Sequence, residues 1–307
     1  MAESGIVVYA AIAANVAIAA AKFAVAGITG SAAMLSEGIH STVDTGNDVL
    51  LLIGMRRSRR QSDEEHPFGY GKELYFSSLI VAILIFGFGG GVSAYEGVLH
   101  ILNPQPIENV GWSYIVLGCS ALFEGISFAV ALRAVLKEKG ERPFWNSLHN
   151  SKDPTTFTVL AEDGAALIGL ALAALGIYGS QRLRMPVLDG VASVAIGILL
   201  AGVAVALIHE SRGLLIGEGV SPKTAAAIRQ MVGDDDEVVR ATSPLSMYFG
   251  PENVLLTLDV EFRHDLSSVA VAAAVRRFEQ SIRTRYPKIK RIYIEAVPPV
   301  ATPADSG

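Results

Sequence analysis

Long apolar segments alternate with short polar loops through the first two thirds of the chain. The segments cover residues 6–28, 32–55, 74–99, 111–136, 154–178 and 186–208. Each segment is long enough to cross the hydrocarbon core of a bilayer as an α-helix. The pattern therefore predicts an α-helical membrane protein with six transmembrane helices, in a transport domain that spans residues 1–212.

The pattern changes after residue 212, where polar and apolar residues mix. Proline and glycine at their ends and the spacing of apolar residues predict helices at residues 222–232 and 269–286. Runs rich in β-branched and alternating apolar residues predict strands at residues 238–247, 252–262 and 291–295. We expect a cytoplasmic α+β dimerisation domain at residues 213–297, followed by a disordered tail at residues 298–307.

Composition supports a membrane protein, because 51% of the residues are hydrophobic, only 18% are charged and the mean hydropathy is +0.41. The net charge of -5 argues against a general nucleic-acid binder, which needs basic patches to neutralise phosphate. The one cysteine, Cys119, excludes an intrachain disulfide framework, and its apolar surroundings predict a small buried side chain.

Basic residues are distributed unevenly among the short loops. Five Lys and Arg residues lie at residues 56–72 and five at residues 133–152, whereas the opposite loops contain only Arg182 and Arg184. Cytoplasmic loops retain such residues, so both termini are expected in the cytoplasm. The predicted location is a bacterial inner or plasma membrane.

Ionisable residues inside the apolar segments indicate an ion site, because such groups are costly in a bilayer and usually line an ion or proton pathway. His40 and Asp44 lie four residues apart, on one face of a helix, and Glu162 and Asp163 are adjacent in another segment. One imidazole with two or three carboxylates suits Zn²⁺, Mn²⁺, Fe²⁺ or Co²⁺. As alternatives, His40 and Asp44 only bond each other or a neighbouring helix, and the acid pair only starts a helix near the membrane surface.

Two further polar residues lie in the first apolar segment. Asn15 and Lys22 are expected to contact neighbouring helices or to extend their polar ends toward the membrane surface.

Several motifs resemble the cation diffusion facilitator family. The resemblance rests on the runs at residues 29–33, 36–44 and 66–73, on Asp189, and on the runs at residues 214–218 and 250–254. It covers nearly the whole chain. It implies a homodimeric exporter with six helices per protomer, a ferredoxin-like cytoplasmic domain, and export of metal from the cytosol in exchange for protons.

The resemblance also implies a ligand set. The membrane site of the family takes two ligands from the second helix and two from the fifth, and His40, Asp44 and Asp163 match three of them. The fourth position holds Val159, which cannot bind a metal, so we expect Glu162 to replace it, with a water molecule as the alternative. The acid pair resembles the subgroup of the family that contains zinc transporter nine.

Accessory sites of the family are less complete in this chain. Asp63 and His66 match two ligands of a loop site, but Tyr70 replaces the third, so this site is expected to be weak or absent. The resemblance further implies a salt bridge from Lys72 to an acid near the end of the sixth helix, for which Glu218 is the candidate. In the cytoplasmic domain the only histidine is His264, and Glu295 occupies a ligand position of the family. These two residues are too few for the binuclear zinc cluster of some family members.

The expected function is export of a divalent transition metal, most of all Zn²⁺, by metal/proton antiport with alternating access, in which His40 suits the role of proton carrier. The expected partners are a second copy of the chain, the bilayer and the metal, with no prosthetic group and no enzymatic activity. The alternative function is a metal sensor or scaffold without transport. Clustered His or Cys residues in the cytoplasmic domain would favour it, and the sequence lacks them. An intramembrane hydrolase is disfavoured because no HExxH motif occurs.

Overall fold

The computed structural model describes residues 2–139 and 154–298, in two compact units. The helical unit comprises Met1–Arg57 and Glu73–Arg212. The sheet unit comprises Ser58–Lys72 and Gly213–Gly307. Apart from residue 298, the predicted disordered tail lies outside the described residues.

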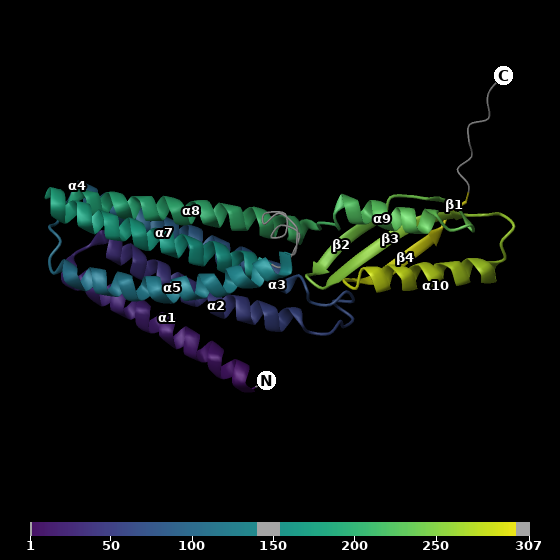
Figure 1. Ribbon diagram of the computed structural model, residues 1–307, viewed down its shortest axis with the longest axis horizontal. Helices are drawn as coiled ribbons and strands as arrows, with labels where there is room; N and C mark the ends of the chain where they lie inside the picture. Colours follow the sequence, from purple (N-terminus) through teal and green to yellow (C-terminus); the bar gives the residue numbers. More distant parts are fainter. Residues whose placement is uncertain (1, 140–153, 299–307) are drawn as a thin grey trace, which may run out of the picture. The chain divides into compact units, whose positions relative to one another are not determined.

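The helical unit consists of long helices (Figure 1). They are α1 (Ala2–Thr29), α2 (Ala32–Ser58), α3 (Glu73–Leu84), η1 (Ile85–Val92), α4 (Ser93–Leu102), α5 (Val110–Lys139), α7 (Pro154–Leu183) and α8 (Val187–Ile216). The segments α3, η1 and α4 are continuous, and η1 is π-helical. The glycine-rich pattern of this stretch did not predict the change of helix type.

Four stretches of the described residues are long and apolar enough to cross a membrane. They are Glu73–Leu102, Val110–Lys137, Phe157–Leu183 and Val187–Ile216, and a shorter apolar helix covers Asn15–Thr29. Helix α2 is not among them, because it carries acidic residues such as Glu37, Asp44 and Asp48. The chain is thus a helical membrane protein with four clear spans, and the count of six stays a prediction.

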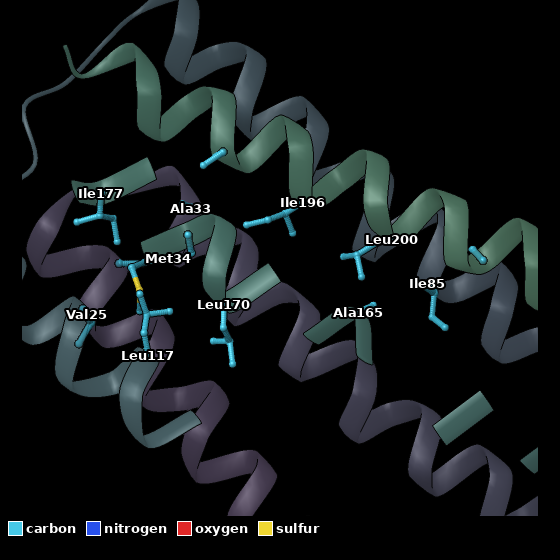
Figure 2. Close-up of a cluster of buried hydrophobic side chains, with 14 of the residues drawn as sticks. Val25, Ala33, Met34, Ile85, Leu117, Ala165, Leu170, Ile177, Ile196 and Leu200 are labelled. Atoms are coloured by element: carbon cyan, nitrogen blue, oxygen red, sulfur yellow. The ribbon is translucent and has the colours of Figure 1, made fainter. Parts of the chain in front are cut away.

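Apolar side chains from several helices form the core of the helical unit (Figure 2). Met34 of α2, Leu117 of α5, Ile177 of α7 and Ile196 of α8 are all nearly inaccessible to solvent. The outward faces are also apolar, as expected where a helix meets lipid rather than water. Cys119 lies on such a face of α5 and is exposed, so the expectation of a buried thiol is wrong.

Small residues bring α4 and α8 into close contact. A Cβ atom added to Gly97 would lie 2.6 Å from the backbone nitrogen of Val194, and one added to Gly197 would lie 2.7 Å from that of Ala94. No side chain larger than hydrogen fits at either glycine without displacing backbone. Small residues allow such close approach in the packing of membrane helices.

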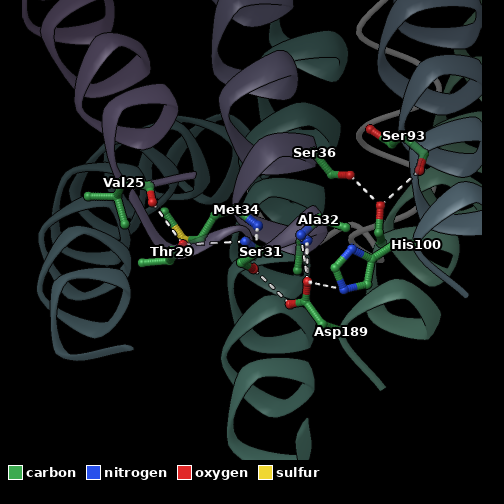
Figure 3. Close-up of polar contacts among 11 residues, drawn as sticks. Val25, Thr29, Ser31, Ala32, Met34, Ser36, Ser93, His100 and Asp189 are labelled. Carbon is green, nitrogen blue, oxygen red and sulfur yellow. Dashed lines mark hydrogen bonds and ion pairs between the residues drawn. The ribbon is translucent and has the colours of Figure 1, made fainter. Parts of the chain in front are cut away.

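Asp189 of α8 caps the N-terminus of α2 (Figure 3). Its carboxylate accepts hydrogen bonds from the backbone N–H groups of Ala32, at 2.5 Å, and Ala33, at 3.3 Å, and from the Ser31 hydroxyl, at 2.7 Å. His100 Nε2 of α4 lies 3.8 Å from the same carboxylate. A negative charge is favourable where free N–H groups begin a helix, so α8 fixes the position of α2.

The sheet unit contains α9 (Pro222–Gly233), β1 (Val238–Ala241), β2 (Leu245–Gly250), β3 (Asn253–Phe262), α10 (Ser268–Arg285) and β4 (Ile289–Ala296). The prediction of one strand over residues 238–247 is wrong, because β1 and β2 are separate. Pro244 stands in the break, and proline has no N–H group with which to continue a strand ladder.

Strand β3 is the centre of the sheet, since β1 and β2 pair with it antiparallel and β4 pairs with it parallel after the α10 crossover. Every second residue of β3, from Val254 to Phe262, is buried. These side chains form one core with Ile228 of α9 and Phe278 of α10, so both helices cover the same face. The unit is a small α+β domain, and the ferredoxin-like arrangement stays a prediction.

The linker between α2 and α3, residues 58–72, packs within the sheet unit. The Phe68 ring stacks on the Phe249 ring of β2 with centroids 4.7 Å apart, and Arg291 of β4 donates a 2.6 Å hydrogen bond to the Pro67 carbonyl oxygen. Gly71 lies so close to the Phe249 carbonyl group that no Cβ atom would fit. The linker therefore belongs structurally to the C-terminal part of the chain.

Candidate metal site

His40, which is buried, and Asp44, which is partly buried, form a pair in the middle of α2. The Nδ1 atom of His40 lies 3.2 Å from Oδ1 of Asp44, and the imidazole is 2% exposed. Within the described residues, both ring nitrogens of His40 and Oδ1 of Asp44 lack a hydrogen-bond partner. Buried polar atoms are nearly always satisfied in proteins, so this set is unusual and suited to an added ligand.

Glu162 of α7 is buried and is attached to α2. Its Oε1 atom accepts a 2.8 Å hydrogen bond from Nδ2 of Asn47, while Oδ1 of Asn47 has no partner among the described groups. Asn47 follows Asp44 by three residues, which is close to one helical turn. The bond thus brings the carboxylate of Glu162 to the part of α2 that carries the His40–Asp44 pair.

Asp163, next to Glu162 on α7, is bonded to a different helix. Its Oδ2 atom accepts a 2.6 Å hydrogen bond from the Ser127 hydroxyl of α5. Two adjacent residues of a helix point about 100° apart, which explains why one acid reaches α2 and the other α5. In the part of the chain that the structure describes, no group of three or more His, Cys, Asp or Glu side chains is placed to hold a metal. The four predicted ligands are therefore two pairs on facing helices rather than one assembled set.

Lys22 of α1 contacts the neighbouring helix α2, which confirms the first of the two alternatives expected from the sequence, although its partners were not predicted. Its ammonium group donates hydrogen bonds to Oε2 of Glu37, at 3.0 Å, and to the Ser41 hydroxyl, at 2.7 Å. Lys22 and Glu37 are fully buried and form an ion pair. The i, i+4 spacing of Glu37 and Ser41 was the available signal, because it places both groups on one face of α2.

The Asp63–His66 cluster of the linker has a different environment. Asp63 accepts hydrogen bonds from the Tyr70 hydroxyl, at 2.6 Å, and from the backbone N–H of His66, at 2.7 Å. These bonds, that from Tyr70 first, lower the pKa of Asp63 below its usual value. The His66 ring nitrogen Nδ1 lies 3.5 Å from Asp63, and both side chains are about half exposed. Tyr70, which replaces the third ligand of the loop site of the family, thus binds the Asp63 carboxylate by a hydrogen bond.

Lys72 lies in the sheet unit at the end of the linker. Its ammonium group donates a 3.1 Å hydrogen bond to the Leu215 carbonyl oxygen and lies 3.8 Å from the sulfur of Met247. The pairing of Lys72 with Glu218 stays a prediction.

A protein-family model described as the cation efflux transmembrane domain matches residues 8–216, well over half of the chain. The chain belongs to the cation efflux family. The resemblance noted in the sequence is thereby confirmed.

Two curated relatives bear on the subgroup. The human protein named proton-coupled zinc antiporter SLC30A9, mitochondrial, is 35% identical over 237 residues, which cover 76% of this chain and 42% of the relative. The Arabidopsis thaliana metal tolerance protein C4 is 32% identical over 250 residues, which cover 81% of this chain and 55% of the relative. The chain thus matches only about half of the length of these relatives.

A third relative matches along nearly its whole length. The manganese efflux system protein MneP of Bacillus subtilis is 25% identical over 301 residues, which cover 94% of each chain. Relatives with names that refer to zinc and to manganese therefore both resemble this chain.

Proposed function

We propose that this protein exports divalent transition-metal ions, Zn²⁺ foremost, in exchange for protons. The observation that carries the proposal is the His40–Asp44 pair, whose nitrogen and oxygen atoms have no hydrogen-bond partner in the described part of an apolar helical unit of a cation efflux protein. The names of the zinc antiporter and manganese efflux relatives support the substrate class.

The ion would bind to His40, Asp44, Glu162 and Asp163. Glu162 is held against α2 by Asn47, so its carboxylate already lies beside the helix that carries His40 and Asp44. Asp163 is bonded to Ser127 of α5 through Oδ2 only, so it would offer Oδ1 to the ion or exchange the Ser127 bond for it. In a cycle of alternating access, a movement of α7 would bring this carboxylate toward α2 or away from it.

Competition between metal and protons would couple the two fluxes. Metal binding requires an unprotonated imidazole and ionised carboxylates, so each ion that binds displaces protons and each proton that binds favours release of the metal.

In this proposal six helices cross the membrane in each of two protomers, both termini are cytoplasmic, and the sheet unit is a ferredoxin-like dimerisation domain.

Flux measurements on the full chain in proteoliposomes test this proposal. Zn²⁺, Mn²⁺, Fe²⁺ and Co²⁺ are offered under an imposed pH gradient while separate dyes report metal and proton movement. We expect metal flux in one direction and proton flux in the other, and loss of both in His40→Ala. His66→Ala, which changes the exposed histidine of the linker, is the matched control and should retain wild-type flux.

Each other outcome has a defined meaning. Absence of flux for every metal in the wild-type protein, or undiminished flux in His40→Ala, contradicts the proposal. Metal binding that depends on His40 without any flux would support a metal sensor or scaffold instead.

A further inference from the structure

A buried cation lies beside the candidate metal site and is not one of its ligands. The side chain of Lys22 is 0% exposed, as is that of Glu37, although both are charged and lie in an apolar helical unit. Removal of two charges from water costs several kcal/mol for each ion, and apolar residues of similar volume often replace such pairs without loss of stability. A contribution to stability therefore does not explain why this ion pair is buried here.

Lys22 holds α2 at two points. It binds Glu37 Oε2 at 3.0 Å and Ser41 Oγ at 2.7 Å, and these residues lie one turn apart on the same face of α2. An attachment at two points of one face fixes both the rotation of α2 about its axis and its height along α1. His40 lies within the turn that these two residues enclose, so its direction is fixed with theirs.

The polar group beside the His40 ring in the described structure, Oδ1 of Asp44 at 3.2 Å from Nδ1, belongs to the same helix. In most metal sites the second nitrogen of a ligating histidine donates a hydrogen bond that orients the ring. Neither nitrogen of His40 makes a hydrogen bond to the described part of the chain. No hydrogen bond from another helix reaches the imidazole in the described part of the chain, so the rotation and height of α2 decide where His40 and Asp44 lie.

Glu37 also lies against α7. A Cβ atom added to Gly169 would lie 2.7 Å from Oε1 of Glu37, so the glycine leaves room for the carboxylate. Gly169 follows Asp163 by six residues on the same helix. The Lys22–Glu37 pair is therefore located where α1, α2 and α7 meet, and it contacts both helices that carry predicted ligands.

We propose that Lys22 is a positioning residue for the metal site, which sets the turn of α2 that presents His40 by binding Glu37 and Ser41 at once. This inference rests on the proposed function. It assigns to Lys22 no contact with the metal and no part in proton transfer. Its consequence is that metal affinity depends on a residue of α1, a helix that supplies no ligand.

The test compares two serines of α2 that are both buried and hydrogen-bonded. Ser41→Ala removes one of the two attachments to Lys22, whereas Ser36→Ala removes a bond to Ser193 of α8. We expect Ser41→Ala to raise KM for Zn²⁺ about fivefold with little change in kcat. Ser36→Ala should leave KM within about twofold of the wild-type value.

A double variant removes the pair without leaving an isolated charge. Lys22→Met combined with Glu37→Gln should fold, as judged by thermal unfolding and gel filtration in detergent, and should weaken metal binding about tenfold or more, the size of effect seen when groups that orient ligands are lost. The visible absorption of bound Co²⁺ should also change, because it reports the geometry of the ligands.

The results separate this inference from the proposed function. If the wild-type protein neither binds nor transports metal, the proposed function fails. If the wild-type protein does both, while Ser41→Ala and the folded double variant keep the wild-type KM and Co²⁺ spectrum, the positioning role is refuted. If the double variant does not fold, the comparison of Ser41→Ala with Ser36→Ala decides alone.

Discussion

Two parts of this chain contain a histidine and an aspartate at nearly the same spacing, in opposite environments. In α2, His40 is buried and Asp44 is partly buried, and both have atoms without hydrogen-bond partners in the described structure. In the linker, Asp63 and His66 are half exposed, and Asp63 is satisfied by Tyr70 and by the backbone. Burial and hydrogen bonding, rather than residue type, distinguish a candidate ligand pair from a solvated turn.

The two clusters also differ in what holds them. The bonds around Asp63 come from residues at most seven positions away. The turns of α2 are held from α1 by Lys22, from α7 by Glu162 through Asn47, and from α8 by Asp189. The Asp63–His66 cluster therefore depends only on the local fold of the linker, whereas the surroundings of the His40–Asp44 pair depend on the packing of α2 against α1, α7 and α8.

The largest effect is expected at Glu162. If its carboxylate binds the metal, Glu162→Gln should lower Zn²⁺ affinity by more than about 100-fold, because loss of a group that only orients a ligand costs about 10- to 100-fold. Isothermal titration calorimetry of the full chain in detergent measures this. Glu295→Gln, on β4 of the sheet unit, is the control and should leave affinity within about twofold. Near-normal affinity in Glu162→Gln would show that a water molecule completes the site in place of this residue.

A smaller effect is expected at Asp189, which holds α2 from a distance. Asp189→Ala leaves the N–H group of Ala32 without its partner and should lower the free energy of unfolding by about 2 kcal/mol. Asp189→Asn, which keeps an acceptor oxygen but loses the charge, should lose about half as much. Unfolding in detergent, followed by circular dichroism, compares the two. Equal stability of Asp189→Ala and wild type would mean that α2 does not need this cap.

Much of the fold could be predicted from the sequence, because apolar periodicity reports local structure. The positions of the long helices and the helix, strands, helix and strand of the sheet unit follow from it, although α7 and α8 continue to Leu183 and Ile216, beyond the predicted ends at residues 178 and 208. The break at Pro244 was missed because the apolar alternation on either side of it looked continuous. The π-helical η1 was missed because its packing against α8 depends on contacts that periodicity does not contain.

The candidate site was predictable only in part, for the same reason. The i, i+4 spacing places His40 and Asp44 on one face whatever the tertiary structure. The bonds from Asn47 to Glu162 and from Lys22 to Glu37 depend on the rotation and height of one helix against another. A single sequence gives residues along each helix but not the register between helices.

The smallest effect is expected at Tyr70, in the Asp63–His66 cluster. Tyr70→Phe removes the hydrogen bond that does most to lower the pKa of Asp63, so this pKa should rise toward its usual value near 4. A carboxyl group whose pKa is lowered by folding stabilises the folded state at pH values above its pKa in the unfolded chain. The contribution of Asp63 to the free energy of unfolding should therefore disappear as the pH falls through the pKa of the folded state. In Tyr70→Phe this contribution should be smaller and should disappear at a higher pH. The carbon-13 shift of the labelled Asp63 carboxyl group, assigned with Asp63→Asn, measures the pKa. Zinc flux of Tyr70→Phe at pH 7 should stay within about twofold of wild type, and a large loss of flux would show that the linker cluster takes part in transport despite its exposure.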